Sequence, residues 1–257
     1  MTDKAKTVLI AAALAALFPA AAAGQPPTVK NVVLVHGAWV DGSGWKPVAD
    51  VLTKDGYAVA IVQEPLTSFA DDVAAVRRIM DMQSGPFVLV GHSYGGSVIT
   101  EAGTHSGVAT LVYVAAHMPD AGESEAADGK RFPSDLSKST NIRKTSDNFN
   151  YIDPPAFPAY FAADLPKAQA QFAARSQALT AVASFSGVIT TPAWRSKPSW
   201  MVVAGADRII NPELERWYAK RAGSQIREIA GASHSVYESR PQEVAEVIEA
   251  AARAASK

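Results

Sequence analysis

The feature that most constrains this chain is the alternation of short apolar runs with segments of helical periodicity. Runs such as Val32–Val35 and Phe87–Val90 are continuously apolar and rich in β-branched residues, which indicates strands buried on both faces. The segments between the runs repeat apolar residues every three or four positions, as helices do. This alternation predicts β-α-β units and a mostly parallel, six-stranded sheet flanked by helices. The predicted strands span residues 32–35, 57–62, 87–90, 108–115, 200–204 and 225–229.

The alternation stops between about residues 117 and 197. This stretch contains polar loops with several prolines and helical segments, of which residues 168–178 are the longest, but no apolar strand run. A structureless loop of this length is improbable inside a compact domain. We therefore expect an inserted helical cap between the fourth and fifth strands.

The first 23 residues have the pattern of a secretory signal peptide. Lys4 and Lys6 precede an apolar run, and small residues follow as far as Ala23. We expect cleavage near Ala23 and Gly24, export to the periplasm or the extracellular space, and a mature domain over residues 24–257 without stable membrane insertion. The alternative is an uncleaved anchor, although the run is shorter than the roughly 20 residues of a spanning helix.

The composition excludes several classes of function. The 257 residues include 24 basic and 25 acidic side chains, with no long run of either sign, so we expect no nucleic-acid partner. Because the chain has no cysteine, disulfides, a catalytic thiol and cysteine metal ligands are excluded. The oligomeric state is not indicated by any of these features.

The strongest chemical signal is the segment Gly91-His92-Ser93-Tyr94-Gly95-Gly96. It has the G-x-S-x-G form, in which a sharp turn between a strand and a helix presents a serine. A predicted strand precedes it and a predicted helix follows it, which favours a nucleophilic Ser93 over a passive serine in a structural turn. Such a hydroxyl needs a base within hydrogen-bond reach, and the base needs a third group to orient it.

Among the five histidines, His234 is the candidate base. It lies in a polar loop after the last predicted strand, at the edge where open parallel sheets bind ligands. Asp207 is the first carboxylate after the fifth predicted strand and is the candidate orienting acid. The order serine, aspartate, histidine is typical of serine nucleophiles on such sheets. Asp120 is the rival acid, and the other interpretation of Asp207 is a turn aspartate paired with Arg208.

Acyl transfer also requires hydrogen-bond donors for the negative charge that develops on the carbonyl oxygen. One donor is expected to be the backbone N–H of Tyr94, directly after the candidate nucleophile. The other is expected in the turn after the first strand, where we favour the N–H of Ala38 over that of Trp39. Together these groups predict an oxyanion hole.

These motifs and their order resemble the α/β-hydrolase superfamily over essentially the whole mature chain. The resemblance is greatest to the group that contains plant hydroxynitrile lyases, methylester-cleaving esterases and bacterial esterase-like relatives. It implies an α/β-hydrolase fold, the triad and oxyanion hole named above, and neither a cofactor nor a metal. Hydroxynitrile lyases of this group carry a lysine shortly after the catalytic histidine, whereas Ser235, Val236 and Tyr237 follow here, which weakens the lyase interpretation.

The sequence therefore predicts a serine hydrolase that cleaves carboxylic esters of small or medium apolar substrates through an acyl-enzyme. Two alternatives remain open: C–C cleavage such as cyanohydrin lysis, with a cofactor-free haloperoxidase side activity, or a non-catalytic binder on the same scaffold. Side chains that are candidates for the substrate pocket, although each also has a plain core interpretation, are Trp39, His117, Met118, Phe172 and Trp194.

Overall fold

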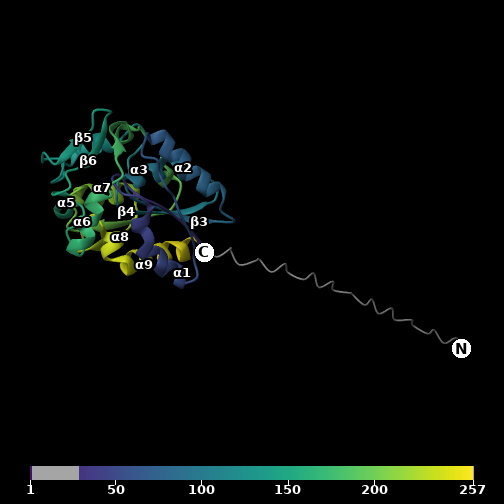
Figure 1. Ribbon diagram of the computed structural model, residues 1–257. Helices are drawn as coiled ribbons and strands as arrows, with labels where there is room; N and C mark the ends of the chain where they lie inside the picture. The colour runs from purple at the N-terminus through teal and green to yellow at the C-terminus, as the bar shows by residue number, and fades with distance from the viewer. Residues whose placement is uncertain (2–28, 257) are drawn as a thin grey trace.

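A six-stranded parallel sheet forms the centre of the molecule in the computed structural model (Figure 1). The structure describes residue 1 and residues 29–256, so the predicted signal peptide and its cleavage site lie outside the described residues. The strand order is β2-β1-β3-β4-β8-β9, and all six predicted strands are confirmed. The strands are β1 (Asn31–Val35), β2 (Ala58–Ile61), β3 (Phe87–Ser93), β4 (Val108–Ala116), β8 (Ser199–Ala204) and β9 (Gln225–Ile229).

Helices cover both faces of this sheet, because successive strand residues point to opposite sides. Val33 and Leu89 belong to one buried cluster, whereas Val32 and Val88 belong to the other. Pro residues at the first helical turn start two of the longer helices, where a missing N–H costs nothing. One face carries α2 (Phe69–Asp81), α3 (Tyr94–Ala102) and α7 (Pro212–Ala222), and the other carries α1 (Lys46–Lys54), α8 (Val236–Ser239) and α9 (Pro241–Ala255).

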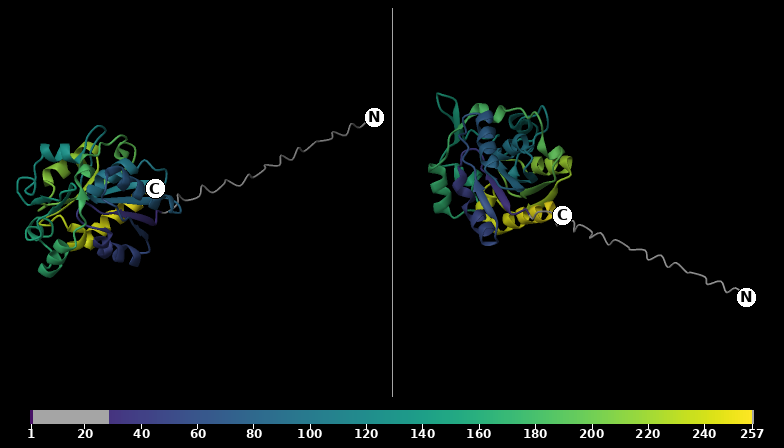
Figure 2. Two further views of the ribbon diagram at one scale, coloured as in Figure 1. Left: turned by 45° about the horizontal axis from the view of Figure 1, so that its top comes forward. Right: turned by 90° about the vertical axis from the view of Figure 1, so that its right-hand side faces the viewer.

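The chain between β4 and β8 forms an insertion at the carboxyl end of the sheet, drawn in teal to green in Figure 2. The expected helical cap is present as an insertion with helices, but it also contains a three-stranded antiparallel sheet that was not expected. Its strands are only two to four residues long and the residues of β5 are exposed, so the sequence has no apolar run at these strands. The elements are α4 (Glu125–Arg131), β5 (Ile142–Lys144), β6 (Phe149–Ile152), α5 (Phe157–Tyr160), α6 (Lys167–Arg175) and β7 (Thr180–Ala181).

The described part of the chain has no helix that is both long and apolar enough to cross a membrane.

Candidate active site

Ser93 is the last residue of β3 and lies in a strained turn before α3. Its φ of 55° is in a region that non-glycine residues rarely adopt. The turn also has no room for side chains at its glycines: a Cβ on Gly95 would lie 2.3 Å from the backbone oxygen of His36, and one on Gly91 would lie 2.6 Å from that of Gly95. The glycines of the motif are therefore required by close packing of the backbone, and this packing holds Ser93 at the end of the strand.

Asp207 and His234 form a buried hydrogen-bonded pair. Nδ1 of His234 lies 2.6 Å from Oδ2 of Asp207, and both side chains are fully buried. The other carboxylate oxygen of Asp207 accepts hydrogen bonds from the backbone N–H groups of Ile209, at 2.7 Å, and Ile210, at 3.0 Å. With Oδ2 of Asp207 as the acceptor, the imidazole proton of His234 lies on Nδ1. Nε2 of His234 is left with its lone pair and, within residues 29–256, has no hydrogen-bond partner.

The loop that carries His234 packs directly against the Ser93 turn. The neighbouring His92 donates from Nε2 to the backbone oxygen of His234 at 2.9 Å, and the centroids of the two rings are 4.6 Å apart. Burial lowers the pKa of His92 well below its usual value, so its ring is neutral. The structure thus brings the candidate base against the turn of the candidate nucleophile, although the Ser93 hydroxyl is not hydrogen-bonded to the free Nε2.

One residue of the insertion, Phe161, holds this histidine loop from the other side. Its backbone oxygen accepts from the N–H of Ser235 at 3.0 Å and from the hydroxyl of Ser233 at 3.4 Å. Its ring meets the imidazole of His234 edge to face, with centroids 4.7 Å apart. The one proton of the Ser233 hydroxyl is directed mainly to the carboxylate of Asp164, which makes the contact to Phe161 secondary. The position of His234 therefore depends on the insertion as well as on the sheet.

The structure does not support the two alternative interpretations, in which Asp120 is the acid or Asp207 pairs with Arg208. Asp120 forms an ion pair with Arg195 at 2.7 Å. Arg208 pairs with Asp135 at 2.9 Å rather than with its neighbour Asp207. Asp207 is therefore available to His234.

The turn after β1 lies against Ser93, as the oxyanion-hole prediction requires. A Cβ on Gly37 would lie 2.6 Å from the Cβ of Ser93. The backbone N–H of Trp39 donates to the hydroxyl of Thr180 in the insertion at 3.1 Å, and its indole N–H donates to Asn150 at 2.8 Å. Because the Trp39 amide is already engaged, Ala38 is the better of the two candidate donors.

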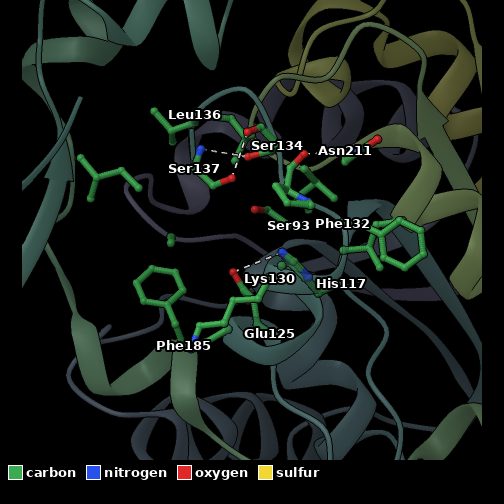
Figure 3. A pocket seen from close by; sticks show the side chains of 18 of the residues that line it. Ser93, His117, Glu125, Lys130, Phe132, Ser134, Leu136, Ser137, Phe185 and Asn211 are labelled. Atoms are coloured by element: carbon green, nitrogen blue, oxygen red, sulfur yellow. Dashed lines mark hydrogen bonds and ion pairs between the residues drawn. The ribbon is translucent and has the colours of Figure 1, made fainter. Parts of the chain in front are cut away.

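A cavity of about 550 Å³ opens in front of Ser93 (Figure 3). Ala38, Trp39 and His117 line it together with Ser93. Much of the remaining wall is apolar and comes from the insertion and the loop after β8. Its large apolar side chains include Phe132, Leu136, Phe185, Ile209, Ile210 and Leu214.

Of the predicted pocket residues, Trp39 and His117 line the cavity, but the structure places the other three elsewhere. Met118 is fully buried in the core cluster and does not line the cavity. Phe172 is 66% exposed on the outer side of α6. Trp194 donates from its indole to the backbone oxygen of Pro119 and packs against Arg221. These corrections follow from long-range packing, which local composition does not reveal.

Two buried glutamates near the site were missed. Glu125 lines the cavity with His117, and burial raises its pKa from 4.5 to about 8. Glu215, on α7, accepts from the backbone N–H of Ala204 at 3.2 Å. Burial first, and then the charge of Asp207, raise the pKa of Glu215 well above its usual value, so it adds no second charge beside the Asp207–His234 pair. Both lie on helices without any motif that would have marked them.

Comparisons with known proteins agree with this architecture. Esterase PIR7B of Oryza sativa subsp. japonica is 26% identical over 254 residues, which cover 85% of this chain and 94% of that protein. A carbendazim hydrolyzing esterase of Nocardioides sp. (strain SG-4G) is 33% identical over 108 residues, which span 37% of this chain and only 45% of that protein.

A solved structure shows the same fold at low sequence identity. Polyneuridine aldehyde esterase superposes with a TM-score of 0.75 and 19% identity, over 86% of this chain and 98% of its own. The model of the family described as "Alpha/beta hydrolase family" matches residues 32–247, which include the six strands of the main sheet except the first residue of β1. The chain is therefore a hydrolase that belongs to the alpha/beta hydrolase family.

Proposed function

We propose that this protein is a carboxylesterase that cleaves small or medium apolar esters through an acyl-enzyme on Ser93. The observation that carries the proposal is the buried hydrogen bond of 2.6 Å between Asp207 and His234. The loop that carries His234 packs on the Ser93 turn, and Nε2 of His234 has no hydrogen-bond partner among the described residues. Ser93 opens onto a cavity with many apolar side chains, which suits an apolar acyl or alcohol group. The esterase names of the relatives support the same reaction class.

In the proposed reaction, Nε2 of His234 accepts the hydroxyl proton of Ser93 while Oγ attacks the ester carbonyl. The Ser93 hydroxyl is not hydrogen-bonded to this Nε2 in the structure, and such contacts are commonly loose in free enzymes. Asp207 keeps the imidazole proton on Nδ1 and stabilises the imidazolium that forms. The imidazolium then protonates the leaving alcohol, and a water molecule, activated by the same base, releases the acid.

The negative charge of the tetrahedral intermediate is assigned to the backbone N–H groups of Ala38 and Tyr94. Tyr94 directly follows Ser93 at the start of α3, where the helix dipole also favours negative charge. Ala38 lies in the turn that packs on Ser93. Removal of one such donor typically costs on the order of 10² to 10³ in rate.

The experiment that tests the proposal is hydrolysis of p-nitrophenyl butyrate by the Ser93→Ala variant. We expect kcat to fall on the order of 10⁶-fold, because the attacking oxygen is removed, while the thermal unfolding midpoint changes little. A fluorophosphonate probe should label the wild-type protein but not this variant. The matched control is Ser43→Ala, since Ser43 is exposed and remote from the cavity. Undiminished turnover by Ser93→Ala would refute the proposal.

We also propose that the protein is exported and that its first 23 residues are removed as a signal peptide. The support is the sequence pattern alone: a basic start, an apolar run and small residues before Gly24. Expression of the full chain followed by N-terminal sequencing of the exported protein should give a first residue near Gly24. An intact Met1 in the membrane fraction would contradict cleavage.

A further inference from the structure

A second polar group lies on the wall of the cavity beside Ser93. His117 follows β4, and its backbone N–H donates to the backbone oxygen of Ser93 at 3.2 Å. The Nε2 atom of its ring lies 3.3 Å from Oε1 of Glu125, at the start of α4. Both side chains line the cavity, and Figure 3 shows this contact beside Ser93. The proposed esterase mechanism uses neither of them.

A chain of hydrogen bonds assigns the proton between these two side chains. The hydroxyl of Tyr218 donates to Asp128 at 2.7 Å, so its oxygen is free to accept from Nδ1–H of His117, 3.4 Å away. With its proton on Nδ1, His117 presents a lone pair on Nε2 to Glu125, and a proton shared by the two must come from the Glu125 carboxyl. Consistently, burial lowers the pKa of His117 to about 3 and raises that of Glu125 to about 8.

The Glu125 carboxyl is incompletely satisfied by the protein. Its contacts to His117, at 3.3 Å, and to the Ser97 hydroxyl, at 3.5 Å, are long compared with the roughly 2.7 Å of a good O–H···O hydrogen bond. Only 14% of its side chain is exposed, although it lines the cavity. Because a carboxylic acid has one proton, a better acceptor that enters this largely desolvated cavity can replace the long contact to His117.

We infer that the carboxylic acid of Glu125 turns its one proton from the long contact with Nε2 of His117 to an uncharged acceptor oxygen of the substrate, and donates a hydrogen bond to it. This inference rests on the proposed esterase function and deepens it. The chemical class is an ester with a second oxygen acceptor, an ether or a carbonyl, a few atoms from the bond that Ser93 attacks. The acceptor belongs either to the acyl chain or to the alcohol.

The charge state of Glu125 controls this donor, and several groups surround it. His117 contacts it from the end of β4, and Ser97 contacts it from α3. The positive charge of Arg221 on α7 is engaged by Glu123 at 2.7 Å. The remaining titratable groups near the pair are Asp128 and Lys130 on α4, Tyr218 on α7, and His234 beyond His117.

The test compares esters of nearly equal shape that differ by one ether oxygen. On the alcohol side the pair is butyl acetate and methoxyethyl acetate, and on the acyl side it is methyl pentanoate and methyl β-methoxypropanoate. The measured quantity is the ratio of kcat/KM for the ether to that for the alkyl ester, which cancels any titration common to both substrates. We expect the wild-type ratio to exceed that of Glu125→Leu by about threefold to tenfold in one arm, the value of one hydrogen bond. The pair of esters whose ratio changes shows whether the acceptor oxygen lies in the alcohol or in the acyl chain.

The pH dependence of this kcat/KM ratio shows whether Glu125 donates a hydrogen bond to the substrate or has only a structural role. The wild-type ratio should fall as the pH rises through about 8, because the ionised carboxylate has no proton to donate. Glu125→Gln keeps an N–H donor that does not titrate, so its ratio should stay high and flat over the same pH range. The matched control is Glu246→Gln on the exposed face of α9, which should reproduce the wild-type pH profile.

Two outcomes would overturn the inference: equal ratios in the wild-type, Glu125→Gln and Glu125→Leu proteins in both arms, or a wild-type ratio that does not change as the pH passes 8. Failure of the esterase proposal is distinguishable, because no ester would then be turned over and fluorophosphonate would not label Ser93. In that case the same pairs of esters are titrated as ligands into the Ser93→Ala protein, alone and combined with Glu125→Gln or Glu125→Leu. Binding is followed by NMR. Equal affinities for ether and alkyl esters there would also overturn the inference.

Discussion

The parallel sheet and the insertion between β4 and β8 position their residues by different physical means. Ser93, Asp207 and His234 lie at the ends of sheet strands or in the loops after them, and backbone ladders align these strands, with a register shift between β3 and β4 at His92/Ser93. The insertion supplies much of the cavity wall from short helices and strands, and separate hydrogen bonds, such as that between Trp39 and Thr180, attach it to the sheet. The comparison teaches that local strand-end geometry positions the candidate reactive groups, whereas long-range contacts shape the cavity.

After the loss expected for Ser93→Ala, the largest effect should come from the sheet side of this comparison, in the Asp207→Asn variant. An asparagine can donate to Nδ1 of His234 and so stabilise the wrong tautomer, and we expect kcat for p-nitrophenyl butyrate to fall on the order of 10⁴-fold. The control is Asp135→Asn, which removes an exposed carboxylate paired with Arg208 and should leave kcat nearly unchanged. A loss smaller than about tenfold in Asp207→Asn would mean that the buried pair has no catalytic role.

An intermediate effect is expected where the two regions are joined, in Thr180→Val. Valine keeps the shape of the buried threonine but cannot accept from the backbone N–H of Trp39, which is then left unpaired. We expect the free energy of unfolding to fall by about 1–3 kcal/mol, as measured by urea denaturation. Thr53→Val, on the exposed side of α1, should change it by no more than about 0.5 kcal/mol. Equal stabilities of the two variants would show that this hydrogen bond does not attach the insertion.

The smallest effect should come from the outer surface of the insertion, in Phe172→Ser. Because this side chain is 66% exposed and lies outside the cavity, we expect a change in stability within about 0.5 kcal/mol and an unchanged KM. Phe185→Ala is the informative partner, since Phe185 lines the cavity and packs against Trp39 with ring centroids 5.8 Å apart. It should raise KM for p-nitrophenyl butyrate. A rise in KM with Phe172→Ser alone would place the substrate elsewhere.

The same division explains what could be predicted from the sequence. The six strands of the main sheet are continuous apolar runs, so their place along the chain is a local property that the periodicity reveals. The glycines around Ser93 and the carboxylate after β8 mark strand ends in the same local way. The family and the fold class were accordingly predicted correctly.

The wall of the cavity could not be predicted in this way. The short strands β5 and β7 carry too few residues to show a period, so the insertion was expected to be helical. Met118 and Phe172 resemble pocket residues in composition, but tertiary packing buries the first and exposes the second. Glu125 and Glu215 are ordinary helix residues in the sequence, and only the surrounding fold desolvates them.

The contacts of Phe161 with the loop that carries His234 have a consequence for protein engineering. Insertions of this kind are natural targets for recombination between relatives, on the assumption that exchanging one alters specificity and leaves the reactive centre intact. Here a graft that replaces the whole segment between β4 and β8 also removes the Phe161 ring that packs on His234 and the Asp164 carboxylate that accepts from Ser233. A functional chimera would have to retain Phe161 and Asp164 from the parent that supplies His234.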